Sequence, residues 1–267
     1  LGTYEGQTQA QANMGTLPRL TPEQKRNPSC SVLPRYWVAE KEVDARLKER
    51  WGRAWLFGWR DIARSTDERT VICSFLPKVA VGHKFPLMLP FGGIAQLAAN
   101  LSSFVLDYAA RQKSAGTSVT YFVLKQLPVL SSKVYKERAP WNVQVTLEDW
   151  IKERVLELTF TSYDMESLAQ ELGDQGPPFV WDEERRLVMR AELDAAYFRL
   201  YGVERDDVGY IMDSFGAFRR NDPERFERTK ALILEIYDAM GKAEETGEPY
   251  QSLLDPPPGH GPRHSEK

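Results

Sequence analysis

Residues 97–130 run LAANLSSFVLDYAARQKSAGTSVTYFVLKQLPVL, and this stretch decides most of the predicted fold. Apolar side chains recur at helical spacing over residues 94–113, which predicts a helix whose last turn carries cations suited to its dipole. Gly116 then interrupts the pattern. Residues 118–124 are rich in β-branched and aromatic side chains, so they predict a strand that Pro128 closes.

The residues upstream of this stretch predict a helix and a hairpin. From residue 40 to about residue 56, one apolar face of a helix is indicated by the spacing of Val43, Leu47, Trp51 and Trp55. Residues 56–64 alternate loosely and lead through a polar turn into residues 70–76, which predict a buried strand ended by Pro77. We expect the helix to dock on this sheet.

The residues downstream predict a helical region. Glycines and prolines separate four expected helices, at 147–158, 182–200, 206–215 and 224–240. The predicted fold class is an α/β (α+β) domain with a mixed or antiparallel sheet and packed helices, followed by a mainly α-helical C-terminal domain. The expected parts are a linker or extended arm at 1–34, the α/β domain at 35–140, the helical domain at 141–240 and a disordered tail at 241–267.

The composition is that of a globular chain with few reactive groups. With 267 residues and 42% hydrophobic content, the chain can bury one large core or two smaller ones. No apolar run reaches the roughly 18 residues of a membrane span and no secretory signal opens the chain, so we predict a cytoplasmic protein without a membrane partner. Cys30 and Cys73 lack metal-ligand spacing, which predicts reduced thiols and no metal site. The start at Leu1 and the polar stretch after it indicate a fragment of a longer chain.

Charge divides the chain more clearly than its net value of −3 suggests. Between Arg35 and Arg138 there are 17 Lys and Arg against 9 Asp and Glu, whereas residues 139–267 hold 15 against 27. A basic segment followed by an acidic one is typical of a module that faces nucleic acid and a module that faces protein or solvent. Surface charge also divides in this way without any functional reason.

Ten side chains in the basic segment are candidate DNA contacts. Lys and Arg bind phosphates and base edges, and hydroxyl groups add phosphate hydrogen bonds. We expect the candidates to converge on one concave surface; they are Arg60, Arg64, Arg69, Lys78, Lys84, Arg111, Lys113, Thr117, Tyr121 and Lys125. Each cation taken singly is more simply a solvated surface charge, so the prediction depends on the cluster.

Aromatic and acidic residues offer weaker candidates. Trp51, Trp55, Phe57 and Trp59 could stack on a flipped or unpaired base, although the helical spacing of the first two favours core packing. Acidic pairs near expected helix starts are ordinary capping and dipole partners, so we assign no catalytic role to them.

Several motifs, taken in order, resemble one group of DNA-modifying enzymes. Residues 97–111 and the strand-like YFVLKQLP of residues 121–128 resemble the end of target-recognition domains in type IIG and type IIL restriction-modification enzymes and in related phage-defence adenine methyltransferases. Residues 36–77 resemble the first half of such a domain. Residues 190–212, with RAELDA, LYG and YIM, resemble the C-terminal helical segment of these large enzymes. The resemblance spans residues 33–240.

The resemblance implies a specificity module without a catalytic centre. It implies recognition of a double-stranded DNA sequence, next to an N-terminal methyltransferase domain of the same full-length protein that methylates an adenine. S-adenosylmethionine would be the cofactor of the full enzyme, and this chain would bind no cofactor and no metal. The family's Asn-Pro-Pro-Tyr loop and glycine-bearing cofactor motif do not occur in the sequence.

Two other classes of function stay open at this point. The basic segment could contact an acidic protein within a phage-defence scaffold, in which case duplex DNA would not compete for it. The chain could also be an independent enzyme whose site the sequence does not reveal. A deep pocket lined by carboxylates of strongly shifted pKa would favour that third possibility.

Overall fold

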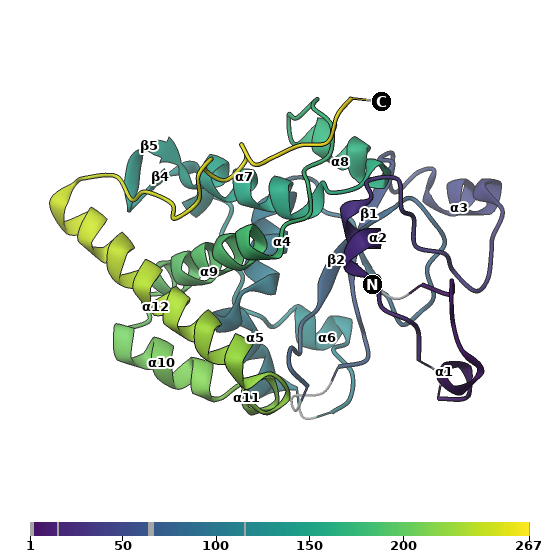
Figure 1. Cartoon of the computed structure of the whole chain (residues 1–267), viewed down its shortest axis with the longest axis horizontal. Coiled ribbons are helices and arrows are strands. Elements are labelled where there is room, and N and C mark those ends of the chain that lie inside the picture. The colour runs from purple at the N-terminus through teal and green to yellow at the C-terminus, as the bar shows by residue number, and fades with distance from the viewer. Residues whose placement is uncertain (1–2, 15, 64–66, 115, 267) are drawn as a thin grey trace.

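The computed structural model describes residues 3–14, 16–63, 67–114 and 116–266, and it is a mixed α/β chain (Figure 1). The strands are β1 (Trp55–Trp59), β2 (Cys73–Pro77), β3 (Leu87–Met88), β4 (Arg138–Ala139) and β5 (Asn142–Thr146). The first helices are α1 (Gln9–Asn13), α2 (Pro22–Arg26), α3 (Glu40–Leu47), α4 (Ile94–Ser102), α5 (Phe104–Lys113) and α6 (Tyr121–Leu124). The later helices are α7 (Leu147–Thr159), α8 (Glu166–Glu171), α9 (Glu183–Leu200), α10 (Arg205–Asp213), α11 (Gly216–Asn221) and α12 (Pro223–Thr246). The predicted α/β class, the antiparallel sheet and the helical C-terminal part are thereby confirmed.

Strand β1 lies in the middle of a three-stranded sheet of order β2-β1-β3. It runs antiparallel to both neighbours, so that Trp55 lies opposite Pro77 and Trp59 lies opposite Cys73. All residues of β1 are buried, as expected for a strand covered on both faces. The register places residues that flank Trp55 and residues that flank Trp59 at opposite ends of the sheet, roughly 13 Å apart.

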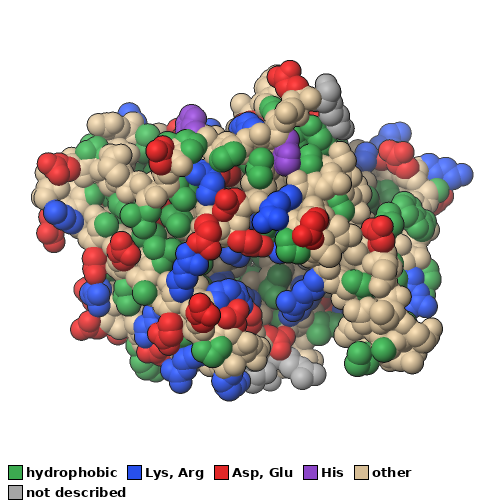
Figure 2. Space-filling model, viewed as in Figure 1, with side chains coloured by type: hydrophobic (Ala, Val, Ile, Leu, Met, Phe, Trp, Pro, Cys, Tyr) green, Lys and Arg blue, Asp and Glu red, His purple; other side chains and the backbone are tan. Residues whose placement is uncertain are grey.

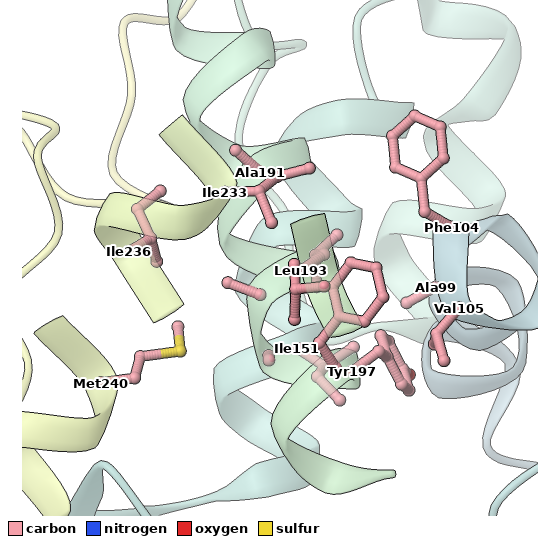
Figure 3. Packing of buried hydrophobic residues seen from close by; sticks show 14 of the residues in the cluster. Ala99, Phe104, Val105, Ile151, Ala191, Leu193, Tyr197, Ile233, Ile236 and Met240 are labelled. Carbon is pink, nitrogen blue, oxygen red and sulfur yellow. The ribbon is translucent and has the colours of Figure 1, made fainter. Parts of the chain in front are cut away.

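Two large apolar clusters hold the elements together. One gathers α7, α9 and α12 and includes Phe104 and Val105 of α5 (Figure 3). The other surrounds β1 and α4 and includes Leu156 of α7 and Phe179. Both clusters contain residues from either side of position 140, so no gap in the core separates the α/β part from the helical part among the residues described.

The helix predicted for residues 40–56 is wrong in its second half. Helix α3 ends at Leu47, and Trp55 begins β1. The apolar spacing persists beyond the helix because Trp51 and Trp55 are both core residues, 8% and 1% exposed, whose rings pack edge to face with centroids 4.9 Å apart. The indole N–H of Trp51 also donates to the carbonyl of Trp55.

Residues 94–113 form the two helices α4 and α5 in place of the one predicted. Ser103 separates them with an extended backbone, at φ −73° and ψ 149°. Its hydroxyl donates to the carbonyl of Asn100 at 2.8 Å and accepts from the N–H of Leu106 at 3.4 Å. Serine competes with helical backbone bonding in this way and favours caps over helix interiors.

The strand predicted for residues 118–124 is also wrong, because most of this segment forms helix α6. The segment contributes only an isolated antiparallel bridge between Ser118 and Ile62 before Thr120, which is extended, leads into the helical turn. Trp59 contacts this segment through the Val119 carbonyl and the Tyr121 ring. Tertiary context thus overrides the β propensity of the side chains here.

Residues 241–266 are ordered against the helices, whereas disorder is predicted for residues 241–267. Helix α12 takes up the first part of this range, and the rest runs back across the helical part (Figure 1). Tyr250 is buried and donates from its hydroxyl to Glu192 at 2.9 Å. Arg263 forms an ion pair with Asp174. Polar anchors of this kind hold a proline-rich segment that has few apolar side chains to bury.

The first 34 residues are expected as a linker or extended arm. Those among them that the structure describes form the short helices α1 and α2 and are otherwise irregular. Lys25 of α2 forms an ion pair of 2.9 Å with Glu183 of α9. The backbone N–H of Tyr163 donates to the carbonyl of Pro28 at 3.0 Å. Among the helices of the described residues, none combines the length and the apolar character needed to cross a membrane.

A buried carboxylate joins the approach to β2 with helix α5. Asp107 is 0% exposed and accepts hydrogen bonds from the backbone N–H groups of Thr70 and Val71, each at 3.0 Å. The Nε of Arg69 lies 3.0 Å from the same carboxylate. A buried charge is tolerated when its lone pairs are satisfied by such donors.

We predict that Asp107→Ala lowers the free energy of unfolding by about 3 kcal/mol or more, because two buried N–H groups and a guanidinium lose their acceptor. Urea denaturation followed by circular dichroism measures this change. Asp206→Ala is the matched control, since Asp206 is exposed in the first turn of α10 and its loss should cost less than about 1 kcal/mol. Equal transition midpoints for the two variants would contradict the role assigned to Asp107.

Candidate nucleic-acid interface

Trp59 anchors the segment after α5 to the end of β1. Its ring is 0% exposed, and its indole N–H donates to the carbonyl of Val119 at 2.6 Å. The ring of Tyr121 packs edge to face on the indole with centroids 4.7 Å apart. The hydroxyl of Tyr121 donates to the carbonyl of Leu87 in β3 at 2.9 Å. Helix α6 is therefore fixed to this end of the sheet.

Further polar residues gather at the same end of β1. Arg60 directly follows the strand and is exposed. The backbone N–H of Asp61 donates to the carbonyl of Lys84 at 2.9 Å, and the Lys84 ammonium lies 2.8 Å from the Asp61 carboxylate. The carbonyl of Thr117 accepts from the N–H of Ala63 at 3.1 Å. Backbone hydrogen bonds thus bring three sequence-distant loops together.

Two exposed lysines complete this surface. Lys113 is the last residue of α5, and Lys125 follows the last residue of α6. Among the residues described, no acidic side chain lies within ion-pair distance of either lysine. We call the whole surface the Trp59 edge; it comprises Arg60, Lys84, Lys113, Thr117, Tyr121, Phe122 and Lys125.

Three other candidate cations are engaged by partners within the fold. Lys78 follows Pro77 and therefore lies at the opposite end of the sheet, where its ammonium pairs with Asp44 at 2.7 Å. Arg69 is engaged by Asp107 and by the ring of Phe104, whose centroid is 4.0 Å away. These contacts give Lys78 and Arg69 structural partners.

Arg111 is likewise occupied within the fold. Its guanidinium donates to the backbone carbonyls of Asp67 at 2.6 Å and Glu68 at 2.9 Å. It also lies over the ring of Phe215, 4.2 Å from the centroid. Burial lowers the pKa of Arg111 from its usual value. Arg64, the remaining candidate, lies outside the described residues. Because Lys78, Arg69 and Arg111 are engaged within the fold, the single surface of free cations expected from the sequence is found only in part among the described residues.

The aromatic residues suggested for base stacking are core residues. Trp51, Trp55, Phe57 and Trp59 are each at most 8% exposed. The most exposed ring on the Trp59 edge is that of Phe122, at 76%, and Tyr121 follows at 49%. Sequence reasoning did not single out Phe122, because a strand over 118–124 would place alternate side chains on a packed face. A helical turn that begins after Thr120 leaves the Phe122 ring in solvent.

Pockets lie elsewhere on the molecule. A hollow of about 200 Å³ is lined by residues that include Phe160, Tyr163 and Pro177. A second, of about 290 Å³, lies at the Trp55 end of the sheet beside Arg53 and the fully exposed Phe91. Neither lining contains histidine or cysteine. Across the described part of the chain, no group of three or more His, Cys, Asp or Glu side chains could hold a metal ion.

Comparison with known proteins leaves the function to be argued from geometry. No model of a protein family, no curated protein and no solved structure matches this chain. The resemblance to adenine methyltransferases therefore stays a prediction. The side chains of the Trp59 edge, with their exposure and partners, carry the functional argument.

Trp59→Phe should loosen α6 without unfolding the chain. The change removes the donor to the Val119 carbonyl and part of the ring that packs on Tyr121, at a cost of about 1–3 kcal/mol. We predict that amide hydrogen exchange of residues 119–127 becomes faster, while exchange in α9 stays unchanged. Trp37→Phe, at a ring that is 76% exposed, is the control. Identical exchange of residues 119–127 in both variants would exclude the anchoring role of Trp59.

Proposed function

We propose that the Trp59 edge binds double-stranded DNA. The observation that carries this proposal is the exposure of Lys113 and Lys125 at the ends of α5 and α6, two helices that contact each other, together with the exposed ring of Phe122 in α6; neither lysine has a carboxylate partner among the described residues. Affinity for DNA comes mainly from cations that neutralise phosphates. A cation already paired within the protein contributes less, because its carboxylate partner must be displaced.

The position of these cations also suits a duplex. Lys113 ends α5, which Asp107 ties to the backbone before β2, and Lys125 follows α6, which Trp59 and the Leu87 carbonyl hold at the end of the sheet. Arg60 adds a third cation, whose contact with Asp67 is long, at 3.4 Å, and exposed. An exposed ion pair of this kind is weak and gives way to a phosphate at little cost.

Thr117 and Phe122 supply groups for base or sugar contacts. The exposed hydroxyl of Thr117 can donate to phosphate or accept from a base amino group. The exposed ring of Phe122 can contact a thymine methyl group or wedge against a base step. An edge with phosphate-binding cations around such groups fits recognition of a sequence better than charge attraction alone.

Our wider proposal is that this chain is the recognition part of an adenine-specific DNA methyltransferase of the restriction-modification or phage-defence kind. What supports it is the order of motifs over residues 33–240 together with the placement of YFVLKQLP residues on the Trp59 edge. The N-terminal methyltransferase domain of the full-length protein would bind S-adenosylmethionine and flip the adenine. This chain would present the duplex to that domain.

Charge reversal at the two unpaired lysines tests DNA binding. For the double variant Lys113→Glu and Lys125→Glu, we predict at least about a tenfold loss of duplex affinity and a plot of log affinity against log salt that is less steep by about two. Fluorescence anisotropy with a labelled duplex at several salt concentrations gives both values.

The matched control is Lys41→Glu with Lys48→Glu, which reverses two exposed lysines on and just after α3, near the opposite end of the sheet. It should retain most of the duplex affinity. Equal losses in both double variants would mean that only net charge matters, which contradicts a DNA site at the Trp59 edge. Absence of duplex binding by the wild type at low salt would instead favour contact with an acidic protein.

A further inference from the structure

Two cations that follow α3 have no acidic partner. Lys and Arg side chains lie among Asp and Glu side chains over much of the face in Figure 2, and several cations of the chain form ion pairs, such as Arg225 with Glu68 at 2.8 Å. Lys48 and Arg50 differ, because both are exposed and no acidic side chain of the described residues lies within ion-pair distance of either. Their charges are therefore free to attract an anion.

Both cations line the hollow of about 290 Å³ at the Trp55 end of the sheet. Its lining comes from two stretches of the chain, residues 48–53 between α3 and β1, and residues 89–91 after β3. The two stretches meet because β1 and β3 are neighbours in the sheet. Small-molecule sites have volumes of roughly 300–1,000 Å³, so a hollow of this size suits a small ligand.

Arg53 fixes the two stretches to each other. One of its terminal nitrogens donates to the carbonyl of Pro90 at 2.8 Å, and its Nε pairs with Glu171 at 2.9 Å. The guanidinium also lies over the ring of Trp51, 4.6 Å from the centroid. The backbone N–H of Trp51 donates to the carbonyl of Leu47 at 2.7 Å, which ties the first stretch to α3. The hollow is thus formed by contacts within the protein, and a ligand need not order it.

The lining offers three kinds of contact to a ligand. The ring of Phe91 is fully exposed, so an aromatic ligand can stack on it. Lys48 and Arg50 supply positive charge for an anionic group. Glu49 is exposed, has no cation within ion-pair distance among the described residues, and can accept hydrogen bonds from hydroxyl or amino groups. A ligand that uses all three contacts carries a planar ring, an anion and hydrogen-bond donors.

We propose that this hollow binds a free mononucleotide. The base stacks on the ring of Phe91, and the ribose hydroxyls donate to Glu49. The phosphate binds Lys48 and Arg50. Bases within duplex DNA stack on one another and leave no open face for Phe91, so a duplex does not fit this hollow. The hollow lies at the opposite end of the sheet from the Trp59 edge, and the proposal does not rest on DNA binding at that edge.

The probe is adenosine 5′-monophosphate (AMP), titrated into the full chain by isothermal titration calorimetry. Wild type should bind AMP, and it should bind adenosine and ribose 5-phosphate at least about tenfold more weakly, because the first lacks the phosphate and the second lacks the base. Absence of AMP binding, or equal affinity for AMP and ribose 5-phosphate, would overturn the proposal.

Two pairs of variants test the ring and the cations separately. Phe91→Ala should weaken AMP binding about tenfold, whereas Tyr210→Ala, at another exposed ring, should not change it. The double variant Lys48→Gln and Arg50→Gln should weaken AMP binding at least about tenfold. Its matched control removes Lys41 and Arg46, two exposed cations of α3 that do not line the hollow, and should bind as the wild type does. Equal affinities within either pair would contradict the site.

Gly52→Leu blocks the hollow without removing a charge. Gly52 does not have a positive φ, and a Cβ added to it would meet no atom within 4 Å, so the fold tolerates a side chain there. We expect an unchanged Tm without ligand and a loss of AMP affinity of at least about tenfold. Full AMP affinity in Gly52→Leu would overturn the proposal.

A competition experiment separates this site from the Trp59 edge. Duplex DNA should not displace AMP from the wild type, and displacement would make nucleic acid the ligand of the hollow, contrary to the proposal. The double variant Lys113→Glu and Lys125→Glu should bind AMP as the wild type does, so the two proposals fail independently.

Discussion

The antiparallel pairing of β1 with both of its neighbours is the constraint on which the rest of the structure depends. The strand is buried on both faces, so its register with β2 and β3 cannot slip without exposing aromatic rings. That register fixes which loops meet at which end. Trp59 then ties α6 to one end of the sheet through its ring and its indole N–H. The polar residues of three loops lie at the same end of the sheet.

For DNA binding, the partners of each cation in the basic segment matter more than the number of cations in excess. Lys78, Arg69 and Arg111 each satisfy a carboxylate, a backbone carbonyl or an aromatic ring and thereby brace the fold. Lys113 and Lys125 have no such partner among the described residues. A count of basic residues cannot separate these two groups, since both lie in polar contexts in the sequence. Only the three-dimensional partners show which cations are free for a polyanion.

The sequence predicts the parts of the fold that depend on local pattern. The long helices α9 and α12 and the strand pairing of β1 with β2 follow from periodicity, caps and turn residues. Segment 118–124 could not be predicted, because its β propensity is overridden by tertiary context, in which Trp59 contacts Val119 and Tyr121. The order of the tail depends on long-range partners such as Glu192, which no local window contains. Phe122 is exposed because segment 118–124 forms a helical turn in place of the predicted strand.

The most direct measurement of the central claim is a footprint of lysine reactivity on the free and DNA-bound chain. Acetylation followed by mass spectrometry reports each lysine separately, and the account predicts that duplex DNA slows modification of Lys113 and Lys125 but not of Lys41 and Lys48. Protection of all four to the same extent, or of the α3 lysines alone, would contradict a DNA-binding surface at the Trp59 edge.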